Sequence, residues 1–104
     1  LGWMCSLLNL KRVNVCNNLV TILPNSLPQE KLETFEAAFN LIEKVPEMMF
    51  FNCFESMKEL DLRFNMIEER DPTLDCFGDK VKLEGNFIEA WIVFGDLQED
   101  VNLT

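Results

Sequence analysis

The stretch of sequence that decides the fold is MKELDLRFNMI, residues 57–67. Within it, Leu60 and Leu62 flank one polar residue, and this alternation is typical of a short strand with one buried face. Asn65 follows three positions after the second leucine. A side-chain amide can satisfy both a donor and an acceptor of a turning backbone. The stretch therefore predicts a strand that ends in a turn held by Asn65.

The same spacing occurs in four segments of the chain. Their asparagines are 22, 25 and 21 residues apart and are Asn18, Asn40, Asn65 and Asn86. The apolar residues at matching offsets before them are Leu10, Val13 and Val15, then Leu32, Phe35 and Ala37, then Met57, Leu60 and Leu62, and last Val81 and Leu83. Stacked copies of such a unit would form a parallel sheet, and each strand would need a long return path.

Residues 57–67 resemble the leucine-rich-repeat family, whose core pattern is L-x-x-L-x-L-x-x-N-x-L, with Met57 in the leading position. The resemblance covers nearly the whole chain and extends through Leu23-Pro24 and Val45-Pro46, but the third and fourth units depart from it after their asparagines. The family implies an α/β fold. It is a right-handed β-α solenoid, with a short parallel sheet on the concave face and helix, 3-10 or loop segments on the convex face.

The resemblance also implies a domain organisation and a structural ladder. We expect one leucine-rich-repeat segment over residues 1–104, with repeats at 10–31, 32–56, 57–77 and 78–97 and partial repeats at 1–9 and 98–104. It would be a fragment of a longer solenoid whose ends are covered by further repeats or by another chain. The ladder would consist of Asn18, Asn40, Asn65 and Asn86, each pointing inward to the backbone of neighbouring turns.

Composition narrows the classes of function. The chain has 18 acidic and 9 basic residues and a net charge of -9, which repels phosphate backbones, so we expect no nucleic-acid partner. No apolar run approaches the roughly 20 residues of a membrane-spanning helix, so we expect no membrane insertion. The absence of histidine removes the usual nucleophilic triads and mixed zinc sites. We therefore expect no enzyme, no metal and no cofactor.

The pattern of cysteines indicates the cellular compartment of the protein. Cys5, Cys16, Cys53 and Cys76 include no C-x-x-C pair. They could form two disulfides in a secreted protein, but scattered cysteines are more often buried free thiols of an intracellular domain. We expect a cytoplasmic protein, with an extracellular location as the alternative.

The outward positions of the strands line the expected concave face. Phe39 and Phe64 occupy equivalent positions on neighbouring strands, which predicts two rings side by side at the strand exits. They are either an anchor for a partner or, as the resemblance to the family implies, a partly packed cover. The predicted partner-binding residues are Glu36, Phe39, Asp61, Arg63, Phe64, Lys82 and Glu84. The alternative is a solvated face of cross-strand ion pairs. Its rows would be Lys11, Glu33, Lys58 and Asp79, and Arg63 with Glu84.

These observations favour a protein-protein interaction or scaffolding module. The alternatives are a fragment of an extracellular receptor or adhesion ectodomain, and a substrate-targeting domain of a larger signalling enzyme or bacterial effector. On the convex side, Pro46 and Asp71-Pro72 predict short helical turns. The phenylalanines predicted to fill the interior near that side are Phe35, Phe51, Phe54, Phe77, Phe87 and Phe94.

Overall fold

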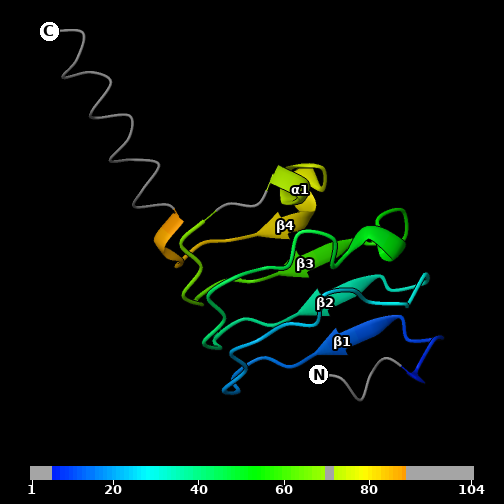
Figure 1. Ribbon diagram of the computed structural model, residues 1–104, viewed down its shortest axis with the longest axis horizontal. Coiled ribbons are helices and arrows are strands. Elements are labelled where there is room, and N and C mark those ends of the chain that lie inside the picture. Colours follow the sequence, from blue (N-terminus) through cyan, green and yellow to red (C-terminus); the bar gives the residue numbers. More distant parts are fainter. Residues whose placement is uncertain (1–5, 70–71, 89–104) are drawn as a thin grey trace, which may run out of the picture.

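The computed structural model describes residues 6–69 and 72–88, and it contains one parallel sheet (Figure 1). The four strands are β1 (Arg12–Asn14), β2 (Thr34–Glu36), β3 (Glu59–Asp61) and β4 (Val81–Lys82). Each strand pairs with the next one in the chain, in the order β1-β2-β3-β4. The predicted parallel sheet is confirmed, and the chain is an α/β protein.

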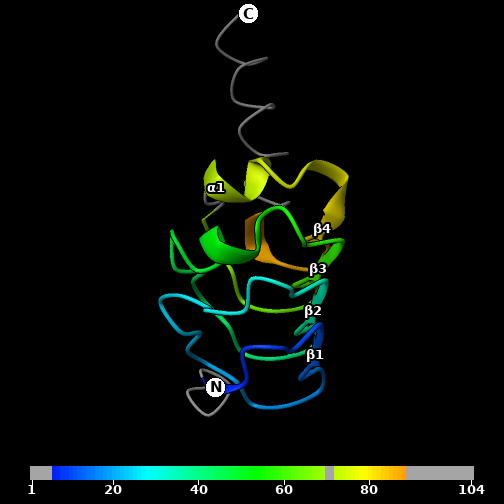
Figure 2. The ribbon, with the colours of Figure 1, turned by 90° about the vertical axis from the view of Figure 1, so that its right-hand side faces the viewer.

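One buried residue lies at the centre of each of the first three strands. Val13, Phe35 and Leu60 are register partners, and Leu60 pairs in turn with Val81. The first three are at most 6% exposed, whereas the residues that flank Val13 are exposed. This is the alternation predicted from the sequence, and it places the core on one side of the sheet. Figure 2 shows the return segments on that side, opposite to the strands' outer face.

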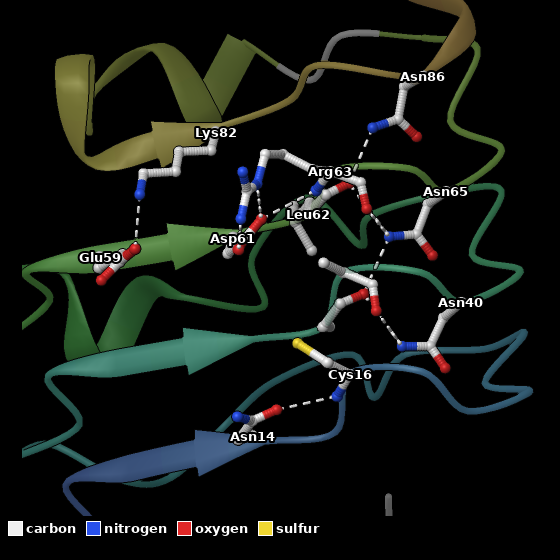
Figure 3. Close-up of polar contacts among 12 residues, drawn as sticks. Asn14, Cys16, Asn40, Glu59, Asp61, Leu62, Arg63, Asn65, Lys82 and Asn86 are labelled. Atoms are coloured by element: carbon white, nitrogen blue, oxygen red, sulfur yellow. Dashed lines mark hydrogen bonds and ion pairs between the residues drawn. The ribbon is translucent and has the colours of Figure 1, made fainter.

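Side-chain amides connect neighbouring units just after the strands. Asn65 donates to the backbone carbonyl of Ala37 at 2.9 Å and accepts from the backbone N–H of Ile42 at 3.1 Å, both in the preceding unit. Asn40 and Asn86 make the equivalent pairs of bonds to their own preceding units. The three amides form a row in Figure 3. They satisfy backbone groups that would otherwise be buried without partners.

Asn18 differs from the other three asparagines. Among the described residues, its amide donates only to the carbonyls of Val15 and Cys16 in its own turn, at 2.9 and 3.0 Å, and its side chain is exposed. The expectation that it would point inward to a neighbouring turn is therefore wrong for the described residues. The reason is its place in the sheet, because β1 is the first strand and has no described unit before it.

The return segments contain short helical pieces. The 3-10 helix η2 spans Phe51–Cys53, the helix α1 spans Pro72–Asp75, and the 3-10 helix η3 spans Gly78–Lys80. The predicted helical turn at Pro72 is confirmed, because α1 begins at this residue. Proline is tolerated in the first turn of a helix, where its missing N–H would have no partner within the helix. A turn also forms after Pro46, whose carbonyl accepts from the backbone N–H of Met49 at 3.1 Å.

The core fills the space between the sheet and the return segments. Its fully buried members include Leu27, Leu32, Ile42, Met49, Met57, Leu62, Ile67 and Leu74. Phe35 and Phe77 are buried as predicted, but the predicted burial of Phe51, Phe54 and Phe87 is wrong, because they are 69%, 44% and 53% exposed. Phe94 lies outside the described residues.

The three-residue period of η2 explains the exposed phenylalanines. Residues three apart share one face of a 3-10 helix. Phe50 and Cys53 therefore both point into the core, at 5% and 0% exposure, while Phe51 and Phe54 point outward together. Phe87 lies between the buried Asn86 and Ile88 at the start of a helical turn, and its own side chain faces solvent. No helix within residues 6–69 and 72–88 is long and apolar enough to cross a membrane.

Candidate functional site

The predicted partner-binding residues lie on the side of the sheet that faces away from the core. Glu36 on β2 pairs in register with Asp61 on β3, and Asp61 pairs with Lys82 on β4. The remaining residues follow the strands directly. We call the surface made by Glu36, Phe39, Asp61, Arg63, Phe64, Lys82 and Glu84 the sheet face.

Asp61 and Arg63 form a bidentate ion pair on the sheet face (Figure 3). The Arg63 Nε donates to Asp61 Oδ1 and its Nη2 donates to Oδ2, both at 2.9 Å. The backbone N–H of Arg63 also donates to Asp61 Oδ1, at 3.1 Å. We expected Asp61 to be exposed, and this is wrong because it is only 5% exposed. The Arg63 side chain folds over it and leaves its own guanidinium as the accessible charge.

The environment of Asp61 lowers its pKa. Burial alone would raise the pKa of this carboxyl group, but the hydrogen bonds and charge of Arg63, together with the charge of Lys82, outweigh that effect. In return, the hydrogen bond to Asp61 raises the pKa of Arg63, and the hydrogen bond to Glu59 raises the pKa of Lys82. The sheet face therefore carries fixed charges at neutral pH.

Cross-strand ion pairs occur on the same side of the sheet. Lys58 and Glu33 lie 3.2 Å apart, which confirms one pair of the predicted alternating row. Lys82 pairs with Glu59 at 2.8 Å, a contact that the sequence analysis missed. Glu84 contributes only its charge to Arg63, which bonds to Asp61 instead. Such exposed pairs add little to stability because water and salt screen them.

Two stacked phenylalanines stand at the strand exits. The ring centroids of Phe39 and Phe64 are 4.6 Å apart and the ring planes differ by 12°, so the predicted side-by-side arrangement is confirmed. The residues remain 51% and 46% exposed. Backbone hydrogen bonds hold the two residues in line, because the N–H of Phe39 donates to the carbonyl of Arg63 and the N–H of Phe64 donates to the carbonyl of Glu84.

Both phenylalanines have a left-handed backbone, with φ angles of 58° and 57°. Asn17 and Gly85 occupy the same position in the first and fourth units, with φ angles of 60° and 77°. Glycine and asparagine tolerate this backbone region, whereas for a bulky residue it costs about 1–2 kcal/mol of conformational free energy. The sequence analysis missed this strain. The signal was present in Asn17 and Gly85, which directly precede Asn18 and Asn86, because both residue types tolerate a left-handed backbone.

An apolar residue follows each of the four asparagines and is exposed. These residues are Leu19, Leu41, Met66 and Phe87, with exposures of 82%, 41%, 38% and 53%. Backbone bonds from Leu41 to Val20, from Met66 to Ile42 and from Phe87 to Ile67 place them side by side in successive units. We call these four residues the exit edge. They extend the apolar part of the site, and a search for apolar residues after each asparagine would have found them.

Three of the four cysteines lie in the described part of the chain. Cys16, Cys53 and Cys76 are free, and Cys5 lies outside the described residues. Burial raises the pKa of the Cys53 thiol to about 11. Within the described part of the chain, no group of three or more histidine, cysteine, aspartate or glutamate residues is placed to hold a metal ion.

The site therefore combines an aromatic stack, an apolar edge and ion-paired charges on one sheet. Comparisons of the chain with protein-family models, with curated proteins and with solved structures gave no match. Half-exposed aromatic rings bury large area with little loss of side-chain freedom when a partner covers them. Surrounding charges orient such a partner.

Proposed function

We propose that this chain is a leucine-rich-repeat segment, a right-handed β-α solenoid that binds a partner protein through its sheet face. The sequential order of the four parallel strands supports the repeat architecture. The asparagine bonds from each unit to the one before it support it further. The strands also fall one in each of the expected repeats, at 10–31, 32–56, 57–77 and 78–97.

The observation that carries the binding proposal is the Phe39–Phe64 stack. The two rings are about half exposed, although their backbones adopt a conformation that disfavours large side chains. Contiguous exposed apolar surface on a folded domain marks an interaction site more often than isolated apolar residues do. Arg63 and Lys82, held by Asp61 and Glu59, add oriented charges beside the stack.

The proposal assigns the chain no catalytic role and places it in the cytoplasm. The free thiols of Cys16, Cys53 and Cys76 support that compartment, because cytosolic reductants keep thiols reduced. The partner is a protein rather than a nucleic acid, since the net charge of -9 opposes phosphate backbones.

Affinity capture with matched variants tests the proposal. The double variant Phe39→Ser, Phe64→Ser removes the stack, and Leu8→Ser removes a comparably exposed apolar side chain outside the sheet face. Circular dichroism first establishes that all chains are folded. Proteins captured from the source cells by the parent chain and by Leu8→Ser are then purified.

Calorimetry on the purified partner gives the decisive measurement. We expect the double variant to bind it at least about tenfold more weakly than the parent, as loss of an aromatic anchor does in other interfaces. The Leu8→Ser chain should bind as the parent does. Equal affinity of all three chains for every captured partner would exclude the sheet face as the binding site.

A further inference from the structure

A second apolar surface lies on the return side of the sheet and has no part in the sheet face. It is a cleft of about 720 Å³ between η2 and α1, and we call it the return cleft. Phe50, Phe51, Phe54 and Phe77 line it. In Figure 1, α1 lies beside β4, and the green helical turn lies at the right-hand end of β3, away from the loops on the left.

The walls of the return cleft are aromatic. The ring centroids of Phe54 and Phe77 lie 5.2 Å apart, and those of Phe50 and Phe77 lie 6.1 Å apart with nearly perpendicular planes. Phe50 and Phe77 are buried and form a fixed floor, whereas Phe51 and Phe54 remain 69% and 44% exposed. Exposed aromatic rings over a packed floor form an open apolar site rather than a part of the core.

The charge around the return cleft is of one sign. Glu30, Glu47 and Glu55 line it and are exposed, and no lysine or arginine is among its lining residues in the described part of the chain. None of the three carboxylates takes part in an ion pair between described residues. Among the described residues, the acidic lining therefore has no cation paired with it.

An aromatic lining with free carboxylates selects the chemistry of a ligand. The faces of aromatic rings carry negative charge density and attract cations, most often arginine. Free carboxylates reinforce that attraction, and arginine can meet them with two parallel hydrogen bonds. The apolar walls favour a ligand with aliphatic groups beside its charge. A second copy of this chain fits poorly, because its net charge of -9 is repelled.

We propose that the return cleft binds an arginine side chain in a basic, apolar-flanked segment of a partner protein. The arginine stacks against Phe51 and Phe54 and its charge faces Glu47 and Glu55, while neighbouring apolar side chains of the segment cover the cleft. This inference does not depend on the sheet face, because the two surfaces share no residue. One chain can then hold two partners at once.

The test uses a defined probe with a matched neutral control. The probe is a short blocked peptide of alternating leucine and arginine, and the control replaces each arginine with citrulline, which keeps the shape and removes the charge. Binding to the full chain is measured by calorimetry. We expect the citrulline peptide to bind about two- to fivefold more weakly per replaced cation-aromatic contact.

Variants of the chain locate the binding site. Phe51→Ser and the double variant Glu47→Gln, Glu55→Gln should each weaken binding of the arginine peptide at least about threefold. These side chains are exposed, so folding should be preserved, and circular dichroism checks it. Met66→Ser on the exit edge is the matched control and should bind as the parent does. The double variant Phe39→Ser, Phe64→Ser should also bind as the parent, which separates this site from the sheet face.

Cys76 supplies an independent readout because it lines the return cleft and is an exposed free thiol. Saturating arginine peptide should slow its alkylation by iodoacetamide and leave that of Cys16 unchanged. Equal binding of the arginine and citrulline peptides, an unchanged alkylation rate of Cys76, or an equal loss of affinity in Met66→Ser would overturn the proposal. Failure of the arginine peptide to bind would also overturn it.

Discussion

The ring of Phe64 occupies the space in which a side chain on Gly85 would lie. A Cβ atom at Gly85 would be 2.3 Å from Phe64 Cδ1 and 2.9 Å from its Cγ. The aromatic column therefore runs from Phe39 over Phe64 to the bare backbone of the next unit. A glycine at this position meets two needs, a left-handed backbone and room for the neighbouring ring.

Gly85→Ala should destabilise the chain and displace the Phe64 ring. The left-handed backbone alone costs about 1–2 kcal/mol for a residue with a Cβ atom, and the clash adds to it. Gly78→Ala is the matched control, because Gly78 has a φ angle of +57° and no atom within 4 Å of its ideal Cβ. Urea unfolding should show a larger loss for Gly85→Ala, and NMR should show shifted ring signals of Phe64 and Phe39 only in that variant. Equal losses would mean that the ring moves aside at no cost.

Asn65→Leu should lower the free energy of unfolding by about 1–3 kcal/mol, because buried backbone groups of Ala37 and Ile42 lose their partner. Asn18→Leu should cost much less, since Asn18 is exposed and its side-chain bonds within the described part of the chain stay in its own turn. The measurement is the urea midpoint at unchanged slope. An unchanged midpoint for Asn65→Leu would refute the structural role of the ladder.

The sequence predicted the strands well because their signals are local and recur. Leu60 and Leu62 carry the alternation of a half-buried strand, and the fixed offset of Asn65 indicates the turn that follows. The structure places both leucines at 0% exposure and Asn65 at 6%. A period shared by four units makes each such assignment far more secure than one unit alone.

Sequence reasoning failed where the outcome depends on contacts across or within a turn. Asp61 was assigned to the surface by alternation, but the length of Arg63 lets it fold back and cover that carboxylate. Phe51 and Phe54 were assigned to the interior by hydrophobicity, but the period of η2 gives the inward positions to Phe50 and Cys53. Residue type alone predicts neither result. The outward positions of Phe51 and Phe54 create part of the return cleft, and the Arg63 side chain covers Asp61 on the sheet face.

The charge of Asp61 should make the free energy of unfolding depend on pH. The folded chain lowers the pKa of Asp61, so the ionised group stabilises the fold above the unfolded value of about 3.9. That contribution is lost as the pH falls through the lower folded pKa. The parent should therefore be more stable than Asp61→Asn at neutral pH, and the difference should shrink on acidification below about pH 4.

Urea unfolding at a series of pH values measures this difference. Glu68→Gln is the control, because Glu68 is exposed and makes no ion pair between described residues. Its stability relative to the parent should stay nearly constant over the same range. A difference between the parent and Asp61→Asn that does not change with pH would show that the charge of Asp61 is not coupled to folding.

The thiols should react in the order that their surroundings dictate. Cys53 is fully buried, its Sγ donates to the carbonyl of Phe50 at 3.5 Å, and its pKa is raised to about 11. Because the thiolate is the reactive form, Cys53 should resist iodoacetamide at neutral pH until urea unfolds the chain. Cys76 is exposed and should react first, and the half-buried Cys16 should follow. Mass mapping of the labelled peptides gives the three rates separately. Labelling of Cys53 at the rate of Cys76 in the folded chain would mean that η2 opens readily, and the floor of the return cleft would then not be rigid.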